Sequence, residues 1–334
     1  MSGATLMVID GMKERGGAKI PSGCILMLYH DDVAMGRHRE EGQVEDRLTH
    51  YAERIHDAYP GVVVATIRLI DQGQNNDVVV VNEGLIFRFP RYVGGIAHLQ
   101  REVGILRAIR DRVPLPIPNP AYTSFAPPTV GYVFMGYRVM GGAPLGREAL
   151  APLNSAEAQA LIAPLAHFLR CLHGVPPEEA LPGVREPIHP LARWEDLYAR
   201  ICQRLFPHMR PDARAWAVEH FEAFLRDPRN RRITPALVHG DFGGSNILYD
   251  AHRHALTGVI DFGSAGLDDP AVDFAAVSTL GPDTLTHLSS AYPEVQGALA
   301  RVAFYRGTFA LQEALFGIEN DDAEAFRAGI EEYA

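Results

Sequence analysis

Lysine is almost absent from this sequence of 334 residues. Lys13 and Lys19 are the two lysines among its 31 basic residues, so every basic residue after position 19 is an arginine. A segment whose basic residues differ in type from those of the remaining chain is typical of an upstream extension. We therefore predict that residues 1–42 form an extension that is poorly ordered or not native, and that the fold begins near Met35 or Gln43.

Cysteine is also scarce. The chain has three cysteines, Cys24, Cys171 and Cys202, which lie far apart in the sequence. An odd number of widely spaced cysteines supports neither a disulfide framework nor a zinc site, and it favours a reducing compartment. No uninterrupted apolar run reaches the ~18–20 residues that a membrane-spanning helix needs. The sequence therefore predicts a cytoplasmic protein with no membrane partner.

Positive charge is in the minority, because 41 acidic residues against 31 basic ones give a formal net charge of −10. An acidic protein repels phosphate backbones, which argues against a nucleic-acid partner. The charge is compatible with a cationic small molecule as partner, and it fits an ordinary acidic protein at least as well. We expect a monomer.

The N-terminal half, residues 43–139, has the pattern of a small sheet with helices. Apolar residues at helical spacing predict helices over residues 43–59 and 98–110. Short runs rich in β-branched and aromatic residues predict five strands, at residues 61–69, 78–81, 85–89, 122–125 and 132–139. Polar turns join the first three strands. We therefore expect a five-stranded antiparallel sheet with one main helix.

The pattern changes after residue 139. Glycines and a proline at residues 140–144 predict a hinge, and residues 145–334 are mostly helical in pattern. Asn154 with Glu157 three residues later has the spacing of a helix-capping pair. Alternate prolines at residues 114–120 predict an extended connector before the last two strands of the sheet. The predicted fold class is α+β with two lobes, the second of them mostly helical.

Two short motifs in the C-terminal half carry groups suited to phosphoryl transfer. His239-Gly240-Asp241 follows one apolar run, with Asn246 five residues after the aspartate, and Asp261-Phe262-Gly263 follows the next. These are the spacings of a kinase catalytic loop and of its metal-binding D-F-G. The reaction needs a carboxylate near the attacking hydroxyl and hard oxygen ligands for Mg²⁺. We predict Asp241 as the catalytic residue and Asn246 and Asp261 as metal ligands.

Other side chains of these motifs are predicted to have structural roles. His239 is expected to brace the loop by hydrogen bonding, and Phe242 and Phe262 to pack in the core. Asp241 or Asp261 taken alone would be interpreted as an ordinary turn aspartate. Their joint spacing, between apolar strands and after a matching sheet and helix, favours the chemical role.

The sequence resembles the aminoglycoside phosphotransferase family, which shares the fold of the eukaryotic protein kinases. The resemblance runs from about residue 43 to the C-terminus and rests first on the two motifs. Residues 86–90, 101–106 and 114–118 are similar to the 2″-phosphotransferase branch of the family. The resemblance implies a protein-kinase-like two-lobed fold, ATP or GTP as phosphate donor, Mg²⁺ as cofactor and a hydroxyl of an aminoglycoside as acceptor.

The resemblance also implies nucleotide-binding residues in the N-terminal half. Kinase-like folds place a basic strand residue on the phosphates and pair it with a helix glutamate, which correspond here to Arg88 and Glu102. The family usually has lysine at the first position, but arginine keeps the charge and can bind phosphate in bidentate fashion. Arg91 is a competing candidate, and a solvated helix position is the alternative for Glu102. Gly73 lies in the turn expected to cover the phosphates, and Met140 in the hinge expected to contact the base.

The acceptor site is less sharply indicated. Five residues separate Asp261-Phe262-Gly263 from Asp269, too few for the activation loop of a protein kinase, so a small-molecule acceptor is expected. Acidic side chains that could bind the ammonium groups of a cationic sugar are Asp268, Asp273, Glu313 and Glu319. A solvated helix face is the alternative for the two glutamates, and Asp269 followed by proline favours a helix start.

Three other functions remain open on the sequence alone. Kinases of macrolides, choline, homoserine or methylthioribose also use an H-G-D loop, so the acceptor is less certain than the reaction. A nucleotide-binding pseudokinase is suggested by arginine at position 88. A metal hydrolase would need more histidine or carboxylate ligands near His239 and Asp241, and the local sequence offers none at known metal-motif spacings.

Overall fold

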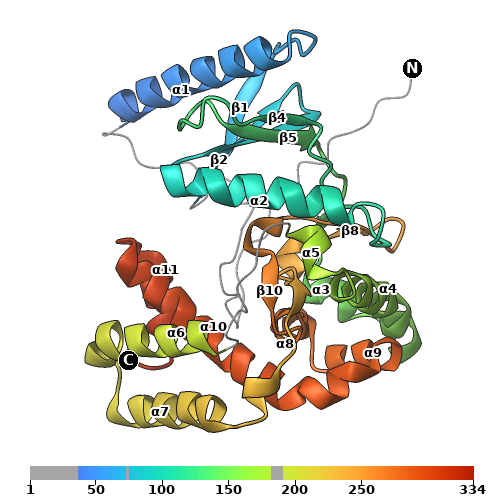
Figure 1. The fold of residues 1–334 in the computed structure, drawn as a ribbon, viewed down its shortest axis with the longest axis vertical. Helices are drawn as coiled ribbons and strands as arrows, with labels where there is room; N and C mark the ends of the chain where they lie inside the picture. The colour runs from blue at the N-terminus through green and yellow to red at the C-terminus, as the bar shows by residue number, and fades with distance from the viewer. Residues whose placement is uncertain (1–36, 73–74, 182–190) are drawn as a thin grey trace.

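A computed structural model describes residues 37–72, 75–181 and 191–334 of the chain, with the backbone alone for residues 37–43, 71 and 72. The N-terminal lobe begins with a long helix and continues as a sheet with a second helix (Figure 1). Its elements are α1 (Arg37–Ala58), β1 (Ile67–Gln72), β2 (Asn76–Val81), β3 (Leu85–Pro90), α2 (Val93–Ile109), β4 (Tyr122–Ser124) and β5 (Phe134–Arg138).

The five strands form one sheet in the order β1-β2-β3-β5-β4, and every neighbouring pair is antiparallel. The sheet separates two helices: Figure 1 shows α1 above it and α2 below it, next to the helical lobe. The face toward α1 has an aromatic core, in which Tyr51 of α1 stacks on Phe89 with ring centroids 3.9 Å apart. Because side chains alternate along a strand, Arg88 points to the opposite face, toward α2.

The C-terminal lobe is mostly helical. Its helices are α3 (Arg147–Leu150), α4 (Ser155–His173), α5 (Pro177–Ala180), α6 (Ala192–Arg204), α7 (Pro211–Arg226), α8 (Ala271–Val277), α9 (Thr284–Ala291), α10 (Leu299–Glu319) and α11 (Ala323–Ile330). Short strands lie between them, namely β6 (Ala143–Pro144), β7 (Ala236–Val238), β8 (Ile247–Asp250), β9 (Ala255–Val259) and β10 (Gly266–Asp268). The predicted two-lobed α+β fold class is confirmed.

The lobes are joined by more than the hinge. One hydrophobic core runs from α2 and the end of β5 through α4 into α8 and α10. The proline-rich connector also contacts the C-terminal lobe, because the backbone N–H of Val259 in β9 donates to the carbonyl of Pro116 at 2.9 Å. The N-terminal lobe is therefore packed directly against the C-terminal lobe, and its connector contacts β9, the strand that precedes the D-F-G motif.

Local sequence patterns predicted the positions of most helices and strands, but not the residues at which some of them begin. The capping pair is confirmed, since the Asn154 side chain accepts from the N–H of Glu157 while the Glu157 carboxylate accepts from the N–H of Asn154. Helix α2 begins five residues before its predicted start at residue 98, because Gly94 and Gly95 have low helix propensity and conceal its first turn. Helix α1 begins six residues before residue 43, inside the predicted extension.

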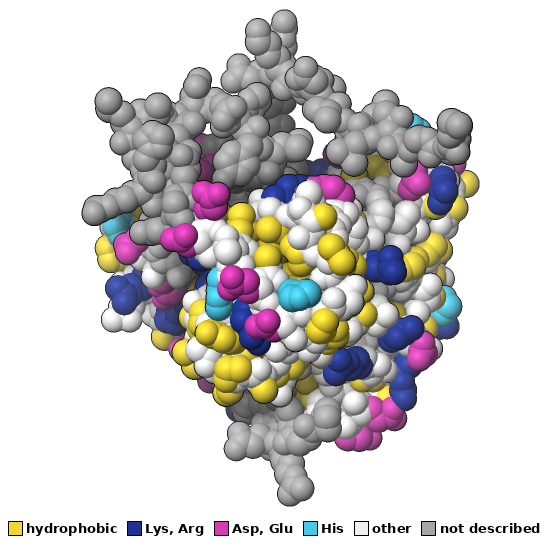
Figure 2. Space-filling view, turned by 90° about the horizontal axis from the view of Figure 1, so that it is seen from above, with side chains coloured by type: hydrophobic (Ala, Val, Ile, Leu, Met, Phe, Trp, Pro, Cys, Tyr) yellow, Lys and Arg dark blue, Asp and Glu magenta, His cyan; other side chains and the backbone are white. Residues whose placement is uncertain are grey.

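Two surface properties bear on the predicted partners. Among the residues that the structure describes, no helix is long and apolar enough to cross a membrane. In the view of Figure 2, acidic and basic side chains are scattered among hydrophobic ones and do not gather into a patch of one sign.

Candidate active site

The H-G-D motif follows β7 directly and turns sharply at Gly240. Gly240 has φ +82°, a left-handed conformation that side chains rarely adopt. A Cβ at this position would lie 2.4 Å from the carbonyl oxygen of Ser264, which follows the D-F-G motif. Glycine is therefore required here by both conformation and space, and its absence of a side chain lets the two motifs approach each other.

A buried aspartate binds the backbone of the H-G-D loop. Both carboxylate oxygens of Asp273, in α8, accept backbone hydrogen bonds, one from the N–H of His239 and one from that of Gly240, each at 2.8 Å. The Nε2 atom of His173 lies 3.1 Å from the same carboxylate. Asp273 is 0% exposed. Its expected role as an acceptor contact is therefore wrong in this structure, since its carboxylate is used to position the loop.

The predicted catalytic aspartate is held by the predicted metal ligand. The side-chain amide of Asn246 donates to both the carbonyl and the Oδ2 of Asp241, each at 2.8 Å. These bonds leave the Oδ1 of Asn246 as its oxygen donor for a cation. Burial raises the pKa of the Asp241 carboxyl above its ordinary range, and the nearby His239 and the bond from Asn246 oppose that shift. The carboxylate is thus oriented and largely shielded from water.

The D-F-G motif lies beside this loop. Asp261 has φ +61° and caps a short turn formed by residues 262–264. The His239 ring lies over Phe262 at 4.6 Å between centroids, and its Nε2 is 3.0 Å from the carbonyl of Ile260. Phe242 and Phe262 are 0% and 1% exposed. The predicted bracing role of His239 and the core roles of both phenylalanines are confirmed.

Arg88, Glu102 and Asp261 meet where the two lobes face each other. Arg88 donates to Glu102 at 2.6 Å and lies 3.5 Å from Asp261 Oδ1. The Glu102 side chain is 3% exposed, so it is not a solvated helix residue. Burial raises the pKa of Glu102, and the charge of Arg88 opposes that shift. Tyr137 of β5 lies beside Arg88 and was not singled out by the sequence; burial raises its pKa to about 12.

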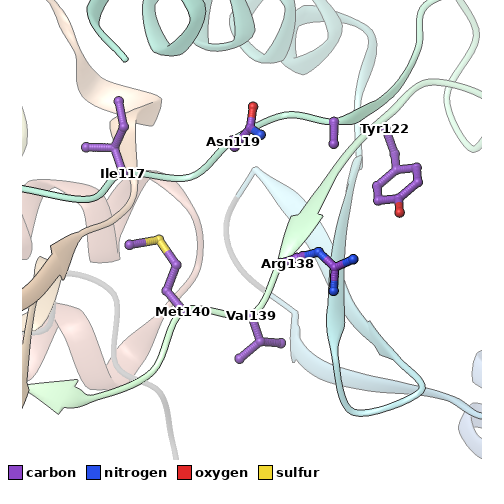
Figure 3. A pocket seen from close by; sticks show the side chains of 7 residues that line it. Ile117, Asn119, Tyr122, Arg138, Val139 and Met140 are labelled. Carbon is purple, nitrogen blue, oxygen red and sulfur yellow. The ribbon is translucent and has the colours of Figure 1, made fainter. Parts of the chain in front are cut away.

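Two other nucleotide-binding candidates have different surroundings. Arg91 lies on the α1 side of the sheet, where its Nε is 3.6 Å from Asp77 Oδ1, so it does not compete with Arg88 for the inner face. Gly73 lies outside the described residues. Met140 contributes to a cavity of about 210 Å³ beside the hinge, and its side chain is directed toward Ile117 (Figure 3). The lining residues come from the connector, β4, the end of β5 and the two residues that follow it.

The remaining acidic candidates are paired or lie on α10. Asp268 accepts from Arg193 at 2.6 Å, and Glu319 accepts two bonds from Arg200. Both arginines come from α6. Glu313 is half-buried on α10. Asp269, the predicted helix start, accepts from the N–H of Ala271 and is also bound by Arg301 and Tyr305. Arginines of α6 therefore form ion pairs with two of the acids that were predicted to bind the acceptor.

The oxygen donors fit magnesium better than a transition metal. The amide oxygen of Asn246 and the carboxylate of Asp261 are hard ligands of the kind that Mg²⁺ binds together with phosphate oxygens. Asp261 keeps 28% of its side chain exposed, so it remains accessible. Within the described parts of the chain, no group of three or more His, Cys, Asp and Glu side chains could hold a metal ion. The extra ligands that a metal hydrolase would need are thus not found there.

Comparison with protein families agrees with this geometry. Residues 66–308 match the model of the phosphotransferase enzyme family, abbreviated APH. The chain belongs to this family. It is therefore a phosphotransferase of the aminoglycoside phosphotransferase type, with the protein-kinase-like fold, and its acceptor group is a hydroxyl.

Individual relatives are distant but extend over most of the chain. Viomycin phosphotransferase of Streptomyces vinaceus is 29% identical over 279 residues, which are 82% of this chain and 94% of that protein. A GDP and kanamycin complex of the aminoglycoside phosphotransferase APH(2″)-IIIa superposes with a TM-score of 0.76 at 25% identity, covering 84% of this chain and 96% of that one. Macrolide 2′-phosphotransferase type I, at 20% identity, has a TM-score of 0.67 over 90% and 99% of the two chains, which indicates a shared fold.

Proposed function

We propose that this protein transfers the γ-phosphate of ATP or GTP to a hydroxyl of a cationic antibiotic, with an aminoglycoside as the leading acceptor. The observation that carries the proposal is the meeting of Arg88, Glu102 and Asp261 opposite a catalytic loop whose Asp241 is oriented by Asn246. Phosphoryl transfer depends mainly on positioning and on charge neutralisation, and these groups supply both.

Each residue has a defined task in this proposal. Asp241 accepts a hydrogen bond from the acceptor hydroxyl and takes its proton as the phosphate is transferred. Arg88 donates to the donor phosphates, and Glu102 keeps the guanidinium in place. Asn246 and Asp261 would hold Mg²⁺, which neutralises phosphate charge when bound. The close contact between the Arg88 and Asp261 side chains brings the phosphate-binding and metal-binding groups to one point.

The acceptor is the open part of the proposal, and two classes have support. Structural likeness to a kanamycin complex supports an aminoglycoside. The name of the Streptomyces relative supports viomycin as a second candidate. Asp268 is paired with Arg193 and Glu319 with Arg200, so either carboxylate could bind a cationic acceptor only after its arginine is displaced.

The test is an acceptor panel with both nucleotides. Kanamycin, gentamicin, viomycin, a macrolide and choline are each incubated with Mg²⁺ and ATP or GTP. Release of the nucleoside diphosphate and a mass gain of one phosphate on the acceptor are measured. We expect turnover of an aminoglycoside, abolished by Asp241→Ala. Turnover of viomycin alone would replace the aminoglycoside by viomycin as the acceptor. Nucleotide binding without turnover of any acceptor would favour the pseudokinase and contradict the proposal.

A further inference from the structure

The hinge, residues 140–144, lies along the β8–β9 pair of strands, which is flanked in sequence by the two predicted metal ligands. Strand β8 begins directly after Asn246, and β9 ends two residues before Asp261. The end of the hinge forms β6, which pairs with β8 so that Ala143 lies opposite Tyr249. Strands β6, β8 and β9 form one small sheet, with β6 at its edge. The segment that joins the lobes is therefore held on the strands that position the metal ligands.

A threonine of β9 binds the hinge directly. The hydroxyl of Thr257 donates to the carbonyl of Gly141 at 2.6 Å. The next residue, Gly142, has φ +115°, and a Cβ there would lie 2.4 Å from the Thr257 hydroxyl oxygen. Glycine is required at position 142 both for this left-handed conformation and because a side chain would clash with the hydroxyl. The hinge backbone is therefore in direct contact with Thr257, and one hydrogen bond attaches it to β9.

The neighbouring residue of β9 contacts the hinge as well. Gly258 leaves room for the Met140 side chain, because a Cβ on Gly258 would lie 2.2 Å from Met140 Cε. The same Cβ would lie 2.9 Å from the carbonyl oxygen of Pro116, the connector residue that accepts from the N–H of Val259. In Figure 3 the Met140 side chain is directed toward the connector. The hinge, the connector and β9 are therefore in contact at Gly258, three residues before Asp261.

These contacts close a path between two groups that meet across the lobes. Arg88 lies on β3, which pairs with β5, and β5 runs into the hinge. Thr257 binds the hinge at Gly141 and lies four residues before Asp261. The path returns to its start because the Arg88 guanidinium is 3.5 Å from Asp261 Oδ1. A shift of the hinge relative to β9 would therefore change the separation of the Arg88 and Asp261 side chains.

We propose that Thr257 is a positioning residue, whose hydroxyl fastens the hinge to β9 and thereby sets the separation between Arg88 and Asp261. The inference rests on the proposed binding of a nucleotide and Mg²⁺, but not on the identity of the acceptor. Bound phosphates have to reach the guanidinium on one side and, through the metal, the Asp261 carboxylate on the other. Without the Thr257 hydrogen bond that separation varies, which weakens binding of the metal–nucleotide complex.

Thr279 offers a matched control. Its hydroxyl also donates to a backbone carbonyl, that of Ala276, at 2.7 Å. This bond spans three residues, from the end of α8 into the turn that follows it. Thr257→Val and Thr279→Val therefore each remove one hydroxyl from a backbone carbonyl and keep a β-branched side chain, but only the first releases the hinge. Thr257→Ser keeps the hydroxyl and should behave as the wild type does.

The experiment measures, by calorimetry, the dissociation constants of the non-hydrolysable analogues AMP-PNP and GMP-PNP with Mg²⁺ and with EDTA, together with the thermal midpoint. The proteins are the full-length wild type, Thr257→Val, Thr257→Ser and Thr279→Val. With Mg²⁺ we expect Thr257→Val to bind the analogue that the wild type prefers about fivefold more weakly, which corresponds to one hydrogen bond.

The other measurements separate the metal-dependent effect from a general one. With EDTA we expect Thr257→Val to change affinity by less than about twofold, because without the metal the Asp261 carboxylate does not attract the phosphates. Thr257→Ser and Thr279→Val should stay within about twofold of the wild type under both conditions. The thermal midpoints of the two valine variants should fall by similar amounts, since each loses one hydrogen bond.

Three results with the variants would overturn the inference. Unchanged affinity of Thr257→Val with Mg²⁺ would show that this hydroxyl does not set the site. Equal weakening with Mg²⁺ and with EDTA would assign the effect to the base and not to the separation of Arg88 and Asp261. Weakening in Thr257→Ser or Thr279→Val as large as in Thr257→Val would show that the hinge hydrogen bond is not the cause. If the wild type itself binds neither analogue, the proposed function fails and the inference with it, a result that differs from all three.

Discussion

Each face of the N-terminal sheet buries one carboxylate paired with arginine, and the two clusters differ in what they can reach. On the inner face, Glu102 binds Arg88, which also contacts Asp261 of the other lobe. On the outer face, Asp77 binds Arg47 and Tyr51 of α1 and contacts no residue of the C-terminal lobe among the interactions of the described residues. Similar chemistry therefore links the two lobes on one face and attaches a helix to the sheet on the other.

This difference teaches that burial of an ion pair does not by itself mark a catalytic group. Both carboxylates are at most 3% exposed, and both have short contacts to a guanidinium. The two clusters differ in their third residue. It is Asp261 of the C-terminal lobe on the inner face and Tyr51 of α1 on the outer face. Substitutions on the inner face should therefore change turnover most strongly.

Replacing Arg88 by methionine should have the largest effect. It removes the guanidinium expected on the phosphates and leaves Glu102 buried without its partner. We expect kcat/KM to fall roughly 10²–10³-fold, as for loss of a transition-state donor, and the free energy of unfolding to fall by about 3 kcal/mol. Steady-state kinetics and urea unfolding measure the two. Full activity in Arg88→Met would remove Arg88 from the site.

Glu102→Gln should have the next largest effect. The amide keeps the shape of the side chain but loses the charge that orients Arg88, and we expect kcat/KM to fall about 30-fold, as when a supporting partner of a functional group is lost. Glu83→Gln is the matched control, since Glu83 pairs with Arg68 at the surface with both side chains more than half exposed. Such a pair contributes about 1 kcal/mol or less, so equal losses in the two variants would contradict the distinction between the pairs.

Arg88→Lys should be milder. It restores the residue that the family usually has and keeps the positive charge, but an ammonium cannot contact Glu102 and Asp261 with separate nitrogens of a planar fork. We expect kcat/KM to fall about fivefold, the worth of roughly one hydrogen bond. A rise in activity would indicate that arginine is a handicap at this position, as the pseudokinase hypothesis requires.

The smallest effect is expected in a double variant that joins the two faces. Because Arg88 and Tyr51 belong to clusters that share no partner, the effects of Arg88→Lys and Tyr51→Phe on the free energy of nucleotide binding should add to within about 0.5 kcal/mol. Calorimetry on both single variants and the double variant measures this sum. A clearly larger coupling would mean that the two clusters act as one unit.

Contacts between residues that are close in the chain could be predicted from the sequence, whereas contacts between distant residues could not. Asp241 and Asn246 are five residues apart, and one short loop between β7 and β8 brings them together. Asp273 instead supports a loop 33 residues upstream, and Asp77 meets an α1 residue 26 positions away. No local pattern distinguishes such a supporting aspartate from an exposed one, which is why Asp273 was assigned to the acceptor.

The separation of interacting residues along the chain also explains which parts of the fold could be predicted. Strand alternation and the capping pair at Asn154 act within a few residues, so the sheet and the start of α4 could be predicted. Pairing of acids with arginines of α6 depends on how helices pack, so the surroundings of Asp268 and Glu319 could not be predicted. The start of α2 was predicted too late in the sequence for a local reason, because two adjacent glycines with low helix propensity lie in its first turn.

The guanidinium of Arg88 also determines how this protein responds to chemical probes. Nucleotide analogues that acylate an amine beside the phosphates depend on a lysine, whereas a guanidinium stays protonated and is a poor nucleophile. From residue 20 to residue 334 the chain offers no lysine at all. If a nucleotide binds beside Arg88 as proposed, such reagents will meet a guanidinium at that position and no amine.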